Sequence, residues 1–239
     1  EGGGHFWVFM QYVLGLRELG CDVYWLEHHP RHDDRHLHDS EAGLFFDRMR
    51  RFGMHGKAVL YNASGAATAG SGDFQYHGLS HADAEALCAR ADLLLNFDYR
   101  IDPHLLGRFA RTALVDIDPG LLQFWIAAGQ LEIPAHDLYF TIGETVGTEK
   151  AGFPDCGLPW KRIRPLVCLS HWPFTYDDSA AAFTTVSGWW GGAGKGEWVT
   201  DGGETFFENN KRVSFLEFVD LPGRTDQVLE LALCLGEGD

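Results

Sequence analysis

The chain has 239 residues, of which 45% are hydrophobic and 22% are charged, and its formal net charge at pH 7 is -15. This length is sufficient to bury a substantial core, and no apolar run approaches the roughly 20 residues that a membrane-spanning helix needs. The negative charge repels phosphate backbones, so it argues against nucleic acid as a partner.

Short apolar runs alternate with helical patterns through the first 170 residues. The runs are typical of buried parallel strands, and the patterns between them are typical of crossover helices. The predicted helices cover residues 6–19, 80–90, 103–111 and 121–129. The predicted strands cover residues 23–27, 57–61, 91–97, 112–117, 136–142 and 165–169. This alternation predicts an α/β fold with a Rossmann-like parallel sheet flanked by helices.

The composition of the sequence changes after residue 172, where Pro, Asp, Ala and Gly become frequent. A strand over 183–190 and a helix over 225–235 are predicted beyond that point. We therefore predict an N-terminal domain over 1–172, followed over 173–239 by a linker and the start of a second α/β domain. One strand and one helix do not complete a domain, and the opening glycines have no strand before them. We expect both ends to be truncated, with the first strand missing.

Cysteines are few, odd in number and widely spaced, and they form no C-x-x-C pair. They stand at Cys21, Cys88, Cys156, Cys168 and Cys234. This arrangement argues against a disulfide framework and against a cysteine zinc site. Reduced thiols are typical of the cytoplasm, where we expect the protein to be located.

Polar residues follow the predicted strands at their carboxyl ends, where open parallel sheets bind their ligands. They are Glu27, His28, Asn62, Ser64, Asn96, Asp98, Asp116, Asp118, Glu144 and His171. Any one of them can instead cap a helix or close a turn. Their shared location predicts a common binding face.

Three glycines and a histidine stand in front of the first predicted helix. Gly2, Gly3 and Gly4 can let the backbone approach a ligand, and the N–H groups of a helix N-terminus favour negative charge there. His5 adds a group that titrates near neutral pH. The alternative is a tight turn followed by a surface histidine. A dinucleotide fingerprint is excluded, because Trp7 stands where its third glycine is required.

Other motifs give weaker signals. The five histidines within residues 28–38 make a zinc site conceivable, but Pro30 interrupts the segment and Arg31 and Arg35 repel a cation. We therefore expect a polar, pH-sensitive loop there and no metal site. The glycines around Lys195 do not form a phosphate-binding P-loop, and no G-x-S-x-G elbow indicates a serine hydrolase.

Several stretches carry a family resemblance. The run GGGHFWVFMQYVLGLRELGCDVYWLE resembles the opening of GT-B glycosyltransferases, in which a glycine loop precedes a helix, an L-G pair and a strand. ADLLLNFD resembles their mid-domain strand that ends in an acidic residue. VDIDPG, FTIGETVG and GLPW...RPLVCLSHWP are similar to a group of bacterial proteins labelled glycosyltransferases. The resemblance covers most of residues 1–172.

The resemblance implies a two-domain, metal-independent enzyme whose N-terminal domain binds the acceptor and whose C-terminal domain binds a nucleotide-activated sugar. It implies that His5 is the general base, oriented by Asp98, because a neutral imidazole held by a carboxylate can take the proton of an attacking hydroxyl. Asp116, Asp118 and Glu144 are then acceptor-binding candidates, with helix capping as their alternative role. Inverting members often carry proline three residues after the histidine, whereas this chain has Val8. Retaining members keep the glycine loop near the donor phosphate without needing the base.

Three hypotheses follow. The first is a glycosyltransferase that moves a sugar from a nucleotide-activated donor to a hydroxyl acceptor, with this chain as mainly its acceptor-side domain. The second is a non-catalytic α/β module that binds a small polar metabolite at the same face. The third, a Rossmann enzyme that modifies nucleotides or sugars in another way, is weakened by the missing fingerprint. No cofactor is expected besides the nucleotide-sugar co-substrate.

Overall fold

The computed structural model describes residues 3–29, 35–63, 73–189, 198–201, 204–208 and 210–234. The chain divides into two compact units. Unit 1 comprises residues 1–119, 133–151 and 157–173, and unit 2 comprises residues 120–132, 152–156 and 174–239.

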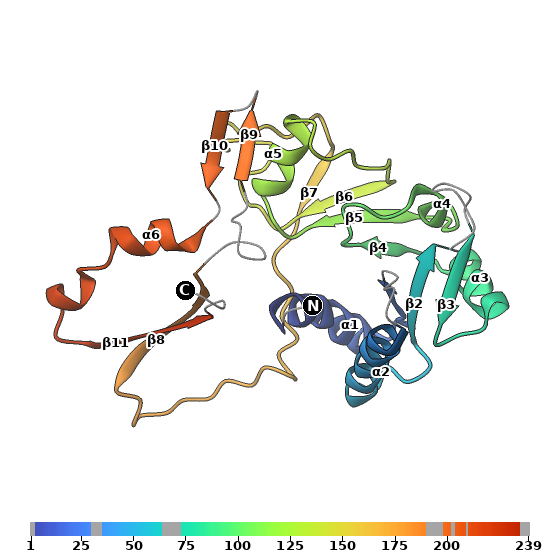
Figure 1. The fold of residues 1–239 in the computed structure, drawn as a ribbon, viewed down its shortest axis with the longest axis horizontal. Coiled ribbons are helices and arrows are strands. Elements are labelled where there is room, and N and C mark those ends of the chain that lie inside the picture. Colours follow the sequence, from blue (N-terminus) through green and yellow to red (C-terminus); the bar gives the residue numbers. More distant parts are fainter. Residues whose placement is uncertain are drawn as a thin grey trace. The chain divides into compact units, whose positions relative to one another are not determined.

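Unit 1 contains a four-stranded, all-parallel sheet (Figure 1). Its strands, in spatial order, are β4 (Leu94–Asn96), β5 (Thr112–Asp116), β6 (Leu138–Thr141) and β7 (Trp160–Arg162). Every residue of β5 is buried, as expected for an inner strand of a parallel sheet that is covered on both faces. The predicted α/β class, a Rossmann-like parallel sheet flanked by helices, is confirmed.

A three-stranded sheet completes the strands of unit 1. Strand β1 (Trp25–His28) pairs in parallel with β2 (Ala58–Ala63), and β2 pairs antiparallel with β3 (Phe74–His77). The two sheets share one apolar cluster, in which Leu26 of β1 and Leu94 of β4 both pack against the group formed by Tyr61, Phe74 and neighbours. Strand β3 was not predicted, because its sequence FQYH lacks the continuous apolar run that marks the other strands.

Helix α1 (Gly3–Glu18) supplies the centre of the second apolar cluster of unit 1. Met10 and Leu14 pack there beside Trp25 of β1 and Met49 of helix α2 (Arg35–Arg51). The predicted helix over 6–19 is therefore confirmed, but it begins earlier. Gly3, Gly4 and His5 form its first turn and do not form a loop in front of it.

Helix α2 was missed by the sequence analysis, which considered only the histidine-rich segment at its start. Its signal is the spacing of Phe45, Met49 and Phe52, which recur at four and three residues and pack against the α1 cluster. Helix α3 (His81–Arg90) agrees with its prediction, because the Ser80 hydroxyl accepts a hydrogen bond from the Asp83 N–H as an N-cap. Helix α4 (Pro103–Leu106) is shorter than predicted, and Asp102 caps it.

The predicted strand over 165–169 is wrong. The fourth parallel strand is β7, which pairs with β6, and no strand covers 165–169. Pro165 has no N–H to donate to a ladder, and the chain instead runs along α1, where the Cys168 N–H donates to the Gln11 side chain at 2.7 Å. His171 therefore does not follow a strand, so it does not belong to the predicted binding face.

The predicted helix over 225–235 is also wrong. These residues contain β11 (Val228–Cys234), which pairs in parallel with β8 (Ala182–Gly188) over seven residue pairs. The Leu, Ala and Glu residues favour a helix by propensity, but the long-range pairing with β8 overrides that preference.

The remaining elements of unit 2 are helix α5 (Leu121–Ala127), the antiparallel strands β9 (Trp198–Asp201) and β10 (Glu204–Glu208), helix α6 (Lys211–Glu217) and the 3₁₀ turn η1 (Leu221–Arg224). Within α5, Gln123 is fully buried and its side chain accepts a hydrogen bond from the Gly120 N–H. None of the helices in the described part of the chain combines the length and apolar character needed to cross a bilayer.

Candidate functional site

The candidate site is the edge of unit 1 at which parallel strands end, which we call the carboxyl rim. It consists of Glu27, His28, Asn62, Asn96, Asp98, Asp116, Asp118, Thr141, Gly143 and Glu144. The rim spans both sheets, because the Tyr61 hydroxyl of β2 interacts with charges from β1 and from the segment after β4. Burial, and then the negative charges of Asp98, Asp102 and Glu27, raise the pKa of Tyr61. Ser64, the other predicted member, lies outside the described residues.

Asp116 stands at the end of β5 and is fully buried. Its Oδ2 accepts a hydrogen bond from the Thr141 hydroxyl at 2.7 Å, and its Oδ1 accepts one from the Asp118 N–H at 3.0 Å. The Thr141 hydroxyl in turn accepts from the Gly143 N–H at 3.0 Å. Asp116 thus joins the loops after β5 and β6, and its carboxylate faces the interior rather than solvent. Asp116 therefore closes the turn after its strand, and it does not cap the following helix, because α5 begins after its N-cap Gly120.

A buried tyrosine reinforces the Asp116 network. The Tyr99 hydroxyl lies 3.5 Å from Asp116 Oδ1 and accepts a hydrogen bond from the Ile117 N–H at 3.1 Å. Burial raises the pKa of Tyr99, and the negative charge of Asp116 raises it further. The Tyr99 hydroxyl therefore stays protonated, and its hydrogen bond with the Ile117 N–H holds the start of the loop that carries Asp118 in place.

Gly143 allows the two loops to approach closely. A Cβ at this position would lie 2.6 Å from both Pro119 Cβ and Val146 Cγ2, so only glycine fits without a shift of the loops. Glu144 follows it and is exposed, and Asp118 is half-buried. Of the three predicted acceptor-binding carboxylates, Asp118 and Glu144 therefore keep access to solvent, whereas Asp116 does not.

Asp98 follows β4 and is exposed, and a buried asparagine holds its turn in place. The Asn96 amide donates to the Asp98 carbonyl at 2.9 Å, and the Asn96 side-chain oxygen accepts from the Asp98 N–H at 2.9 Å. The Asp98 carboxylate accepts from the Arg100 N–H at 2.9 Å. One carboxylate oxygen is thus engaged by the local turn, and the group remains at the surface of the rim.

His136 supports this turn from the segment before β6, and the sequence analysis missed it. Its Nδ1 lies 2.6 Å from the Pro134 carbonyl and its Nε2 lies 3.1 Å from the Asn96 amide nitrogen. A carbonyl only accepts, so Nδ1 carries the proton and Nε2 accepts from Asn96. Burial lowers the pKa of His136, which favours this neutral ring. No sequence pattern links residues 96 and 136, because their contact depends on the sheet.

His5 lies in the first turn of α1 and is exposed. Its ring stacks on Phe9, and Phe9 in turn contacts Phe97, with ring centroids 5.0 Å apart. Phe97 immediately precedes Asp98, so the first turns of α1 lie against the chain that carries Asp98. Within the part of the chain that the structure describes, no hydrogen bond or ion pair joins His5 to Asp98.

The structure describes two of the three glycines before His5. Gly2 lies outside the described residues, and Gly3 begins the helix. A Cβ built on Gly4 would meet no atom within 4 Å. Packing among the described residues therefore does not require glycine at position 4, and the predicted close approach of a ligand stays a prediction.

Two buried polar groups at this side of unit 1 lack a hydrogen-bond partner among the described residues. They are the Tyr12 hydroxyl on α1 and Oδ1 of Asn62 at the end of β2. Their residues are 8% and 3% exposed, and Tyr12 packs on Phe97 with ring centroids 4.9 Å apart. An unmade hydrogen bond of this kind costs about 1–3 kcal/mol, so both groups lower the stability of unit 1.

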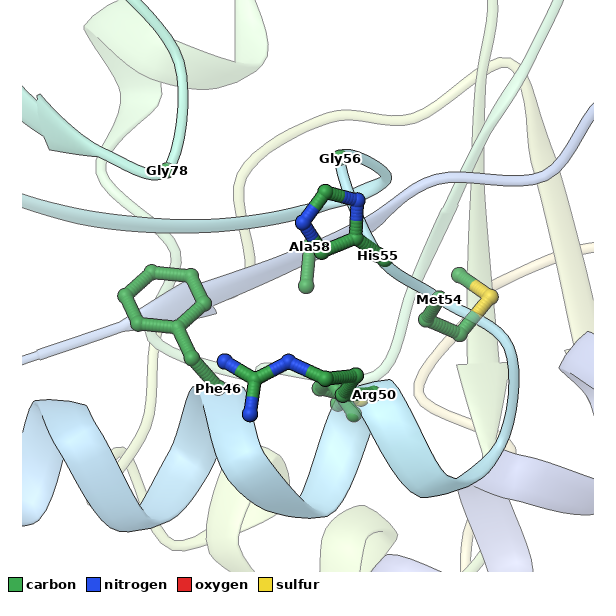
Figure 2. A pocket seen from close by; sticks show the side chains of 8 residues that line it. Phe46, Arg50, Met54, His55, Gly56, Ala58 and Gly78 are labelled. Carbon is green, nitrogen blue, oxygen red and sulfur yellow. The ribbon is translucent and has the colours of Figure 1, made fainter.

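A small pocket lies elsewhere, at the amino end of β2. It has a volume of about 210 Å³ and is lined by Phe46, Met49, Arg50, Met54, His55, Gly56, Ala58 and Gly78. Figure 2 shows Phe46 and Arg50 projecting from α2 toward the chain that enters β2. Ligands of parallel sheets bind at the carboxyl ends of strands, and no predicted site residue lines this pocket. It is therefore separate from the carboxyl rim.

One group of potential metal ligands is present among the described residues. It comprises Glu18, Cys168 and His171, and it lies at the C-terminal end of α1, away from the turns that contact Phe97.

No family model, curated protein or solved structure matches this chain.

Proposed function

We propose that this chain is the acceptor-side domain of a GT-B-type glycosyltransferase, which moves a sugar from a nucleotide-activated donor to a hydroxyl acceptor at the carboxyl rim. The observation that carries the proposal is the packing of Phe9 and Tyr12 of α1 against Phe97, next to Asp98. This packing supports a site in which the first turn of α1 and the acids of the rim face the same acceptor.

The chemistry requires one proton acceptor and one positioning carboxylate. As the acceptor oxygen forms its bond to the anomeric carbon, the bond from that carbon to the nucleotide phosphate breaks and the phosphate keeps the electron pair. The acceptor proton passes to neutral His5, and Asp98 stabilises the imidazolium that results.

The test is a transfer assay on the intact two-domain protein with a panel of nucleotide sugars and hydroxyl acceptors, in which nucleoside diphosphate release and the glycosylated product are both measured. We expect His5→Ala to abolish transfer while donor binding, followed by thermal shift, is retained. His55→Ala is the matched control, because His55 is exposed and lines the pocket at the amino end of β2. Wild-type turnover in His5→Ala rules out His5 as the base.

The alternative is a non-catalytic module that binds a small polar metabolite at the same rim. It is favoured by the engagement of Asp98 and Asp116 in hydrogen bonds to backbone N–H groups and by the lack of a hydrogen bond between His5 and Asp98. A sugar or polyol that raises the thermal midpoint, with no diphosphate release from any donor, supports this module and contradicts the transferase.

A further inference from the structure

Glu18, Cys168 and His171 bring three different donor types together at the C-terminal end of α1. One ligand atom from each residue lies within 4.8 Å of the other two. We propose that this cluster binds a zinc-type divalent cation through the Cys168 thiolate, the His171 imidazole and the Glu18 carboxylate. This inference departs from the sequence analysis, which expected no metal site and considered only the histidines of residues 28–38.

A turn in the chain places the cysteine and the histidine together. The His171 N–H donates to the Cys168 carbonyl at 3.1 Å, and the Trp172 N–H donates to the Leu169 carbonyl at 3.2 Å. The resulting C-x-x-H spacing matches the two-residue separation found between paired ligands in zinc-binding loops. The sequence analysis overlooked it because it assigned Cys168 to a strand.

The turn is fastened to one face of α1. The Cys168 N–H donates to the Gln11 side chain at 2.7 Å in a buried position. Four residues along the helix, Gly15 makes room for Leu166, since a Cβ at Gly15 would lie 2.9 Å from Leu166 Cδ2. Glu18 follows three residues later on the same face, opposite the turn. The helix therefore fixes the backbone positions of Cys168 and Glu18 before any ion binds.

Ser170 connects two of the proposed ligands. Its hydroxyl donates to the Glu18 carboxylate and lies 3.4 Å from Cys168 Sγ. Groups in this outer position orient metal ligands and tune their affinity. Ser170 is thus a positioning residue for the proposed site.

The donor set selects the type of ion. Thiolate and imidazole ligands favour zinc and related transition metals over magnesium and calcium, which prefer oxygen. Tetrahedral bond lengths of 2.0–2.3 Å place adjacent ligand atoms about 3.5 Å apart, so atoms that lie within 4.8 Å of one another need to approach by at most about 1.3 Å. Glu18 and His171 are exposed and can move, whereas Cys168 is 3% exposed and fixed in the core. Three protein ligands leave a fourth position for water.

A bound ion at this place would secure the end of unit 1. Residues 166–171 directly precede the last residues of that unit, and the chain enters unit 2 at Phe174. The site is separate from His5 and Asp98, so its test does not depend on the proposed transferase.

The experiment is a titration of the reduced, purified chain with Co²⁺, whose thiolate complexes show a sulfur-to-metal charge-transfer band together with tetrahedral d–d bands. We expect one equivalent of Co²⁺ to produce both features and Zn²⁺ to displace it. Cys168→Ser should abolish the charge-transfer band, and His171→Ala and Glu18→Gln should each weaken binding by about tenfold or more.

Two controls separate other sources of binding. Cys21→Ser removes an exposed thiol outside the cluster and should leave the spectrum unchanged. The double variant His32→Asn, His36→Asn removes candidate ligands in the histidine-rich segment and should also retain the thiolate band.

The proposal is overturned if no thiolate band appears, or if the band survives Cys168→Ser or disappears with Cys21→Ser. If Cys168→Ser fails to fold, the variants at the two exposed ligands test the proposal instead. An unchanged affinity for Co²⁺ in both His171→Ala and Glu18→Gln also overturns the proposal.

Discussion

The parallel strands of unit 1 are much better covered than the parallel pair β8 and β11 of unit 2. In unit 1, all five residues of β5 are buried, and Val115 is 1% exposed. In unit 2, β8 pairs with β11 over seven residue pairs, yet Val186 and Phe183 of β8 are 80% and 65% exposed. Parallel sheets are normally covered on both faces, since hydrophobic burial supplies most of their stability. Hydrogen-bond register alone therefore does not make a core, and unit 1 supplies most of the buried apolar packing of the described chain.

The largest loss of stability is expected from a substitution at Gly78, where unit 1 has no room for a side chain. Gly78 has a φ of +95°, and a Cβ there would lie 2.4 Å from the Ala58 carbonyl oxygen and 2.8 Å from the Phe46 ring. Gly78→Ala should lower the free energy of unfolding by about 3 kcal/mol or more, because left-handed strain adds to a backbone clash.

Gly56→Ala is the matched control for Gly78→Ala. Gly56 also has a positive φ, of +68°, but its Cβ would meet no atom within 4 Å. We expect a loss of only about 1–2 kcal/mol from strain. Urea denaturation measures both variants, and equal losses would show that the contact with Ala58 does not matter.

Truncation of one valine in each sheet compares the two regions directly. Val115→Ala leaves a cavity in the buried β5 and should cost about 2 kcal/mol, whereas Val186→Ala on the exposed face of β8 should change stability by less than about 0.5 kcal/mol. Denaturation midpoints at constant m-value provide the measurement. A larger loss for Val186→Ala would mean that β8 is covered in solution and that the contrast between the regions is false.

The smallest effect is expected in the pH dependence of stability, through His136, which supports the turn that carries Asp98. Burial lowers the pKa of His136 in the folded state, so the unfolded state binds this proton more readily. The stabilising contribution of neutral His136 is fully present above the ordinary histidine pKa near 6.5. It is lost as the pH falls through the lower pKa that His136 has in the folded state. The free energy of unfolding should therefore fall less steeply below about pH 6.5 in His136→Gln than in wild type. Parallel curves for the two proteins would contradict a buried, neutral His136.

The sequence identified many rim residues but not the groups that orient them. Asn96, Asp98, Asp116, Asp118 and Glu144 were named because they follow apolar runs, and strand ends are visible as a change from apolar to polar residues. Tyr12, Tyr99, Thr141 and His136 were missed. They reach the rim from a helix, a loop or the inside of a strand, and their contacts cross between segments that are distant in the chain.

Local sequence determined the α/β class, the positions of most strands of unit 1 and the Ser80 cap, because burial of apolar runs and capping by a hydroxyl depend on neighbouring residues. Tertiary structure decided which segment became the fourth parallel strand and that residues 228–234 form a strand rather than a helix. It also decided that Asp116 faces inward and that Cys168 lies beside Glu18 and His171. These outcomes depend on a partner far along the chain, and a local pattern records how apolar a segment is without recording which segment it will meet.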